Sequence, residues 1–173
     1  MTMKKFLKVD EWNIIEEGFH ADNLRASESI FSLGNGRFGQ RGNFEESYSS
    51  DSLQGSYVAG ITFLDRTRVG WWKNGYPRFF SRIPNTPDWS GIYVRLIDEE
   101  LDLAHWDVES YERRLDMKAG ISYRDFRVTS PKGNTLEVHV EHINSMDNQN
   151  LCLIKYSVTS VNYEGKISLV PYL

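Results

Sequence analysis

The 173-residue sequence has a single cysteine, no long apolar run and no excess of positive charge. Because a disulfide needs two cysteines, Cys152 cannot form one within the chain, and its apolar neighbours at 151–154 are typical of a buried small hydrophobe. No window approaches the roughly eighteen apolar residues of a membrane span. The apolar stretch near the N-terminus is broken at Lys8, which makes it too short for a secretory signal. We therefore expect a cytoplasmic protein that does not enter a membrane.

The charge pattern excludes several partner classes. A formal net charge of -4 gives no overall attraction to nucleic acid or to an anionic membrane, so neither is expected as a partner. The four histidines show no metal-ligand spacing with cysteine or carboxylate, so no metal and no cofactor are predicted. The length suits one domain, taken as residues 1–173, with one hydrophobic core.

Alternating apolar and polar residues dominate the C-terminal half. Leu136, Val138 and Val140 alternate with polar residues, as in a strand with one buried face. Turn residues separate four such runs, which predicts a meander of four strands at 121–130, 135–144, 151–161 and 166–173. The last run ends in apolar residues, which suggests that further strands would pair with an exposed sheet edge.

The N-terminal half is less regular. Strands are predicted at 57–64, 92–97 and 111–117, and the best helical candidate is the short acidic stretch 107–113. Seven or more short strands with little helix predict an all-β fold, an antiparallel β-sandwich.

Four glycines, Gly34, Gly36, Gly39 and Gly42, lie within nine residues. The segment lacks the Lys-Ser/Thr of a P-loop and the strand-to-helix context of a dinucleotide site, so a close-packed turn is favoured over a phosphate cradle. Glu45 and Glu46 follow it. Neighbours in an extended chain point to opposite faces, so this pair cannot flank one glycosidic bond, and a structural or interdomain role is predicted.

Residues 65–82 bring cations and aromatic rings together. The cations Arg66, Arg68, Lys73, Arg78 and Arg82 alternate with Trp71, Trp72, Tyr76, Phe79 and Phe80. Such a segment suits a sugar ring, a single-stranded nucleic acid or a docking surface. The stiff loop 83–89 adds Asp88 and Trp89. Six residues are thus proposed as substrate-rim or interdomain contacts: Trp71, Trp72, Lys73, Tyr76, Asp88 and Trp89.

Several of these stretches, in this order and spacing, resemble the N-terminal domain of glycoside hydrolase family 65, the maltose, trehalose and kojibiose phosphorylases. The shared stretches are Ser-Leu-Gly-Asn-Gly at 32–36, Arg-Gly-Asn-Phe-Glu-Glu at 41–46, Gly-Ser-Tyr-Val-Ala-Gly at 55–60, residues 65–77, and Leu-Asp-Met at 115–117 with Gly120 and Arg124. The run Thr-Arg-Val-Gly-Trp-Trp-Lys-Asn-Gly-Tyr-Pro at 67–77 is most similar to the maltose phosphorylases.

The resemblance implies a β-sandwich followed by a linker and a catalytic (α/α)6 barrel, with this chain covering the first part of the sandwich. The implied reaction is inverting phosphorolysis of an α-glucoside to β-glucose 1-phosphate, with inorganic phosphate as co-substrate and nucleophile. The catalytic acid in the family is a glutamate of the barrel, so no catalytic residue is expected in this chain. The resemblance also implies a homodimer of the longer enzyme. It favours contact of residues 65–82 with the barrel or with a second subunit over a contribution to the rim of a saccharide or phosphate site.

Two functions are compatible with these features of the sequence. The first is a non-catalytic domain that supports a phosphorylase and its assembly. The second is a free-standing carbohydrate-binding β-sandwich, which the aromatic residues between Trp71 and Trp89 favour. Saturable sugar binding by the chain alone distinguishes the second from the first.

Overall fold

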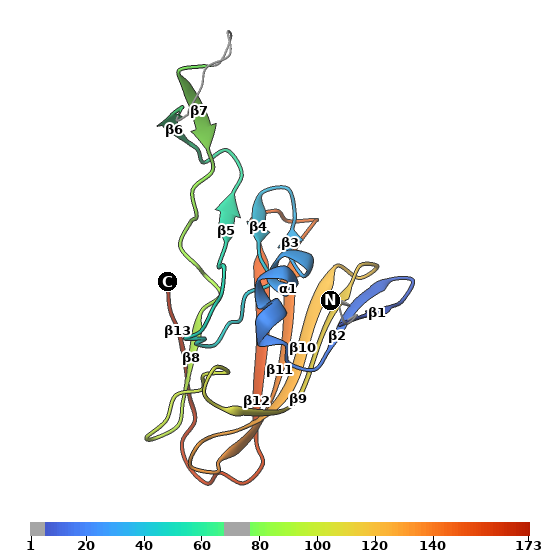
Figure 1. Cartoon of the computed structure of the whole chain (residues 1–173), viewed down its shortest axis with the longest axis vertical. Coiled ribbons are helices and arrows are strands. Elements are labelled where there is room, and N and C mark those ends of the chain that lie inside the picture. The colour runs from blue at the N-terminus through green and yellow to red at the C-terminus, as the bar shows by residue number, and fades with distance from the viewer. Residues whose placement is uncertain (1–5, 68–76) are drawn as a thin grey trace.

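The structure, a computed structural model, describes residues 6–67 and 77–173. Its largest element is a six-stranded antiparallel sheet in the order β1-β2-β9-β10-β11-β12 (Figure 1). Four long strands are adjacent in sequence order, and two short N-terminal strands extend one edge. The strands are β1 (Leu7–Val9), β2 (Asn13–Glu17), β9 (Asp107–Asp116), β10 (Ile121–Thr129), β11 (Thr135–Asn144) and β12 (Cys152–Ser160).

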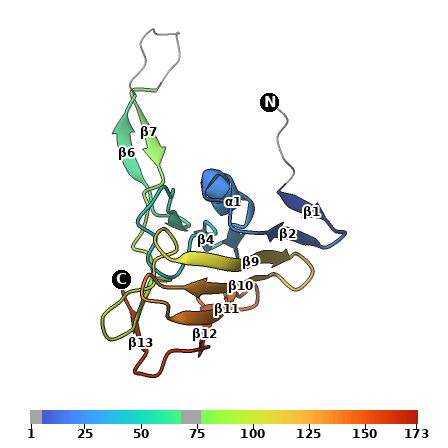
Figure 2. The ribbon, with the colours of Figure 1, turned by 60° about the horizontal axis from the view of Figure 1, so that its bottom comes forward.

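The described residues also form smaller sheets. One has the order β3-β4-β5, a second pairs β8 with β13, and a third pairs β6 with β7. The β6–β7 hairpin projects from the rest of the chain (Figures 1 and 2). These strands are β3 (Leu33–Gly34), β4 (Phe38–Gln40), β5 (Ser56–Val58), β6 (Phe63–Arg66), β7 (Phe79–Arg82), β8 (Ile92–Arg95) and β13 (Ser168–Pro171). A short 3-10 turn, η1 (Ala21–Asn23), leads into helix α1 (Leu24–Ile30).

The hydrophobic core lies between the inner face of the main sheet and a second layer. The inner face supplies side chains at every other position of β9, β10 and β11, as the predicted alternation requires. The second layer includes β8, the segment 96–106 and Leu24 of α1. The core members are Leu24, Phe44, Val94, Leu96, Leu101, Leu103, Trp106, Tyr111, Phe126, Val128, Leu136, Val138 and Val140. This arrangement confirms the predicted all-β sandwich with little helix.

The helical prediction at 107–113 is wrong. These residues belong to β9, in which Tyr111, Arg113 and Leu115 are buried at a period of two. The pairing with β10 shifts register between Arg127 and Val128, and this irregularity disturbs the alternation before Tyr111. The acidic residues that suggested a helix lie on the outer face of the sheet.

Two strand predictions need correction. The run predicted at 57–64 is two strands, β5 and β6, separated by a turn in which Gly60 has a φ of 82°. The meander is β9 to β12, and the last predicted strand instead pairs with β8 in another sheet. The pairing of further strands with a sheet edge stays a prediction.

The glycine-rich segment forms a close-packed turn. Gly36 adopts a φ of 86° between β3 and β4, a backbone conformation that favours glycine. At Gly42 an added Cβ would lie 2.9 Å from both the backbone oxygen and the Cβ of Phe31. The close-packed role predicted for this segment therefore fits its backbone.

Across residues 6–67 and 77–173, no helix has the length and apolar character needed to cross a membrane.

Candidate functional site

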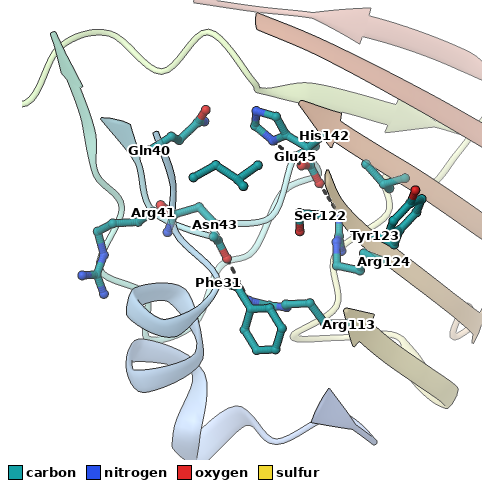
Figure 3. A pocket seen from close by; sticks show the side chains of 13 residues that line it. Phe31, Gln40, Arg41, Asn43, Glu45, Arg113, Ser122, Tyr123, Arg124 and His142 are labelled. Carbon is teal, nitrogen blue, oxygen red and sulfur yellow. Dashed lines mark hydrogen bonds and ion pairs between the residues drawn. The ribbon is translucent and has the colours of Figure 1, made fainter. Parts of the chain in front are cut away.

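Buried charged and polar side chains form the most unusual feature of the sandwich, on the inner face of the main sheet (Figure 3). The pairing register places Glu16 of β2 opposite Arg113 of β9, and Arg113 opposite Arg124 of β10. The row continues through Val140 to Tyr156 of β12. Charges at inward strand positions need partners, because an unpaired buried charge is strongly destabilising.

Arg124 receives its partners from the segment that follows the glycine-rich turn. Its guanidinium donates to carboxylate oxygens of both Glu45 and Glu46, including a 2.6 Å bond from Nη2 to Glu46 Oε2. Tyr156 Oη donates to the same Glu46 oxygen at 3.1 Å. The side chains of Arg124, Glu45 and Glu46 are 6%, 6% and 0% exposed, so solvent does not screen these contacts. We call Arg124, Glu45, Glu46, His142 and Tyr156 the Arg124 cluster.

The cluster corrects one prediction about the adjacent glutamates. Glu45 and Glu46 do not point to opposite sides but converge on one guanidinium, because residues 41–46 are not in a strand. Burial by itself would raise the pKa of Glu45, but the charge of Arg124 and the contacts with His142 outweigh it and lower the pKa to about 2. Glu45 is therefore ionised at neutral pH and holds no proton to donate to a leaving group.

Arg113 forms a second buried group beside the first. Its Nε and Nη2 donate to Tyr111 Oη at 2.8 and 2.6 Å, and its Nη1 donates to the carbonyl of Gly42 at 2.8 Å. The Nε atom lies 3.8 Å from Glu16 Oε2, and the other oxygen of Glu16 accepts a 2.9 Å bond from Ser27 of α1. Arg113 thus connects the glycine-rich segment to the main sheet.

A small cavity adjoins both groups (Figure 3). Its volume is about 20 Å³, close to what one water molecule needs. Two atoms of its lining residues, Gln40 Oε1 and His142 Nε2, have no hydrogen-bond partner among the described residues. The cavity is too small for a sugar or a phosphate ester, so it is no substrate site.

Asp88 and Trp89, proposed from the sequence as rim or interdomain contacts, lie next to this region. The carboxylate of Asp88 accepts hydrogen bonds from the amide and hydroxyl of Ser90 at 3.0 and 2.6 Å and from Gln40 Nε2 at 3.3 Å, and it also binds Gln54. Trp89 contacts the His142 ring in an edge-to-face geometry, with centroids 5.2 Å apart. Asp88 therefore closes its own loop onto β4, while Trp89 is partly exposed.

The other four proposed contact residues, Trp71, Trp72, Lys73 and Tyr76, lie outside the described residues. The strands on either side of them, β6 and β7, expose apolar side chains. Phe63, Leu64, Phe79 and Phe80 are 48%, 74%, 47% and 37% exposed.

Sequence reasoning missed the Arg124 cluster, although one signal was present. Arg113 and Arg124 occupy inward positions in strands whose other inward residues are mostly apolar. An arginine at a position where the alternation predicts a buried apolar residue indicates a buried ion pair. The acidic partners of Arg124, however, are Glu45 and Glu46, which are 78 or more residues away in sequence. Among the described residues, no group of three or more His, Cys, Asp or Glu side chains could hold a metal ion.

Comparison with known proteins gives a consistent family match. The family model described as glycosyl hydrolase family 65, N-terminal domain, matches residues 14–173. A maltose phosphorylase of Bacillus subtilis is 41% identical over 173 residues, 100% of this chain and 23% of that protein. An alpha,alpha-trehalose phosphorylase of Thermoanaerobacter brockii is 34% identical over 172 residues, 98% of this chain and 22% of that protein.

A solved structure agrees with these sequence matches. A chain described as a candidate kojibiose phosphorylase from the human microbiome superimposes with a TM-score of 0.80 at 29% identity. The match covers 90% of this chain and 20% of that one. The chain thus spans about a fifth of the length of the relatives that it matches.

Proposed function

The chain belongs to the family of N-terminal domains of glycosyl hydrolase family 65, and on that premise we propose that it is the non-catalytic part of a carbohydrate phosphorylase. The proposed reaction of the longer protein is inverting phosphorolysis of maltose, or of a related α-glucoside, to β-glucose 1-phosphate and glucose. The observation that favours this most is the 41% identity to a maltose phosphorylase over the whole chain. Inorganic phosphate is the co-substrate, no other cofactor is invoked, and the compartment is the cytoplasm.

The chemistry of the buried carboxylates supports a non-catalytic role. An inverting enzyme needs a carboxylic acid that still holds its proton near neutral pH, beside open space for the substrate. Glu45 has a lowered pKa, and the carboxylates of both Glu45 and Glu46 are buried and accept hydrogen bonds from Arg124. Neither side chain can reach a glycosidic oxygen without dismantling the cluster.

The β6–β7 hairpin supports a role in assembly. A two-stranded hairpin alone is marginally stable in water, and this one exposes aromatic and aliphatic residues while projecting from the sheets (Figure 2). Arg82 lies over the Phe80 ring at 5.1 Å, and Arg78 lies over Phe79 at 5.6 Å, so cations and rings are presented together. Residues of these types are frequent at the centres of interfaces. We assign the hairpin to docking against the catalytic domain of the same protein, in an enzyme that is a homodimer.

The test is a chimera. The 173 residues replace the matching segment of the Bacillus subtilis maltose phosphorylase, and formation of β-glucose 1-phosphate is measured with maltose, trehalose and kojibiose, each with phosphate. We expect turnover of maltose by the chimera, none by the isolated chain, and none by the relative without its N-terminal segment. Turnover by the isolated chain contradicts the non-catalytic assignment, and a folded chimera that lacks activity contradicts the supporting role.

A further inference from the structure

An open groove lies beside Trp89, outside the Arg124 cluster. One wall is formed by Phe38 of β4 and Val58 of β5, which are opposite each other in the sheet pairing. A second wall is the loop from Thr86 to Trp89, and a third is formed by Asn150, in the turn before β12, and by Cys152, the first residue of β12. The groove has a volume of about 380 Å³, within the roughly 300–1,000 Å³ of small-molecule sites. We call it the Trp89 groove.

All three walls are fixed by hydrogen bonds or ring contacts. The amide of Thr86 donates to the carbonyl of Ser56 at 2.8 Å, which attaches the loop to the edge of β5. On the opposite side, Asn35 Nδ2 donates to the carbonyl of Ser145 at 2.9 Å, and Gln149 Nε2 donates to the carbonyl of Asn35 at 3.1 Å. These bonds hold the turn before β12 against the β3–β4 hairpin. The groove is therefore formed in the free chain and needs no partner to assemble it.

The lining combines apolar rings with uncharged hydrogen-bonding groups. Phe38 and Trp89 are both partly exposed, so part of each ring is accessible to a ligand. The Thr86 hydroxyl donates to Ser56 Oγ at 3.2 Å and keeps its lone pairs as acceptors. The side-chain amide of Asn150 is exposed and makes no hydrogen bond to the described residues. None of the described residues that line the groove is charged, in a chain in which 25% of residues are charged.

This chemistry favours a neutral ligand with both apolar and hydroxyl-bearing surfaces. A phosphate or a nucleic acid strand needs cations, which the groove lining lacks. A hexopyranose presents C–H faces that pack on aromatic rings and a rim of hydroxyls that bond to amide and hydroxyl groups. We propose that the Trp89 groove is a non-catalytic binding site for a neutral saccharide of one or two hexose units. Maltose is the probe, and that choice rests on the proposed function.

The first experiment measures maltose binding to the isolated chain by calorimetry. We expect saturable binding by the wild type and a loss of at least tenfold in affinity for Trp89→Ala and for Phe38→Ala. Trp12→Ala is the matched control, because Trp12 is 50% exposed in the turn between β1 and β2 and lines no part of the groove. Thermal unfolding of each variant checks folding, and Trp89→Phe, which keeps a ring, retains more affinity than Trp89→Ala.

Cys152 provides a second, independent measurement. It is the only cysteine in the sequence and lines the groove, so a thiol reagent labels this site alone. We expect maltose to slow labelling of the wild type with the same concentration dependence as the calorimetric binding. No binding by the wild type overturns the proposal, and so does binding that Trp89→Ala and Phe38→Ala leave unchanged or that leaves Cys152 labelling unaffected.

Saturable maltose binding would not by itself make the chain a free-standing binding module, because the supporting domain carries the Trp89 groove, so turnover by the chimera decides between the two functions. The outcomes for the groove are therefore separable from those of the chimera. A chimera that turns over maltose, together with an isolated chain that binds none, overturns the groove and leaves the supporting function intact. An apolar peptide that protects Cys152 when maltose does not would also overturn the saccharide assignment.

Discussion

Replacement of Arg124 by methionine tests whether the Arg124 cluster holds the sandwich together. Methionine keeps much of the side-chain length but removes the charge, which leaves Glu45 and Glu46 buried without a cation. Removing one partner of a buried ion pair costs about 3–5 kcal/mol. The charge of Arg124 also contributes to lowering the pKa of Glu45 from 4.5 to about 2, so its removal acts directly on that carboxylate. We expect Arg124→Met to lower the free energy of unfolding at pH 7 by about 3 kcal/mol or more.

Urea and thermal unfolding followed by circular dichroism measure the change. For a domain of this size each kcal/mol shifts the midpoint by about 2–4 °C, so the loss is about 6–20 °C. Arg127→Met is the matched control. Arg127 is in the same strand but on the outer face, 38% exposed, and it pairs with Glu109 and Glu137. Exposed pairs contribute about 0–1 kcal/mol, so this control stays close to the wild type.

The pH dependence separates an electrostatic loss from a packing loss. In the wild type the folded pKa of Glu45 lies below its unfolded value, so its stabilisation is present above pH 4.5 and is lost as pH falls toward 2. In Arg124→Met the buried carboxylate of Glu45 favours protonation, and the variant therefore gains stability as pH falls from 7 toward 4.5. A variant within 1 kcal/mol of the wild type at pH 7, or a difference that does not shrink on acidification, would refute the reasoning.

Two further predictions concern the glycine-rich segment and the outer face of the sheet. Gly42→Ala brings a methyl group within 2.9 Å of Phe31, so we expect the free energy of unfolding, measured in urea, to fall by about 1–3 kcal/mol. Gly39→Ala is the control and should lose less, because nothing lies within 4 Å of a Cβ added there. Equal losses in the two variants would argue against close packing at Gly42. His139 donates to Asp125 at 2.6 Å, and this bond raises its pKa, so an NMR titration should give a midpoint above 6.5 that Asp125→Asn lowers. The stabilisation from His139 is then complete below pH 6.5 and is lost as pH rises through the folded value, and a midpoint at or below 6.5 would contradict it.

The strands of the C-terminal half could be predicted because one face of their sheet is buried and the other is exposed to solvent. Leu136, Val138 and Val140 lie on the buried face as the alternation indicated. Helix α1 could not be found in the same way. Its buried side has helical spacing at Leu24, Ser27 and Glu28, but two of these residues are polar and bind other elements, so hydrophobic periodicity does not reveal them.

The site was less predictable than the fold because its contacts are remote in sequence. The rim or interdomain contact proposed for Asp88 stays a prediction, and the contacts that the structure shows for this residue are within the chain. The convergence of Glu45 and Glu46 depends on an irregular backbone between β4 and β5, which no local pattern specifies. Their partner is an arginine on a strand that can be placed only once the sheet order is known.

The long-range contacts of the first 46 residues also set the order in which the chain can fold. Strand β2 pairs with β9, about a hundred positions later, and Glu45 and Glu46 bind an arginine 78 or 79 positions later. During synthesis the N-terminal strands therefore leave the ribosome well before any of these partners exist. Topologies dominated by such distant pairings fold slowly, and their strand edges stay unpaired until the partner strands have been synthesised. Nascent β1, β2 and the glycine-rich segment thus need protection from aggregation until β9 and β10 have been made.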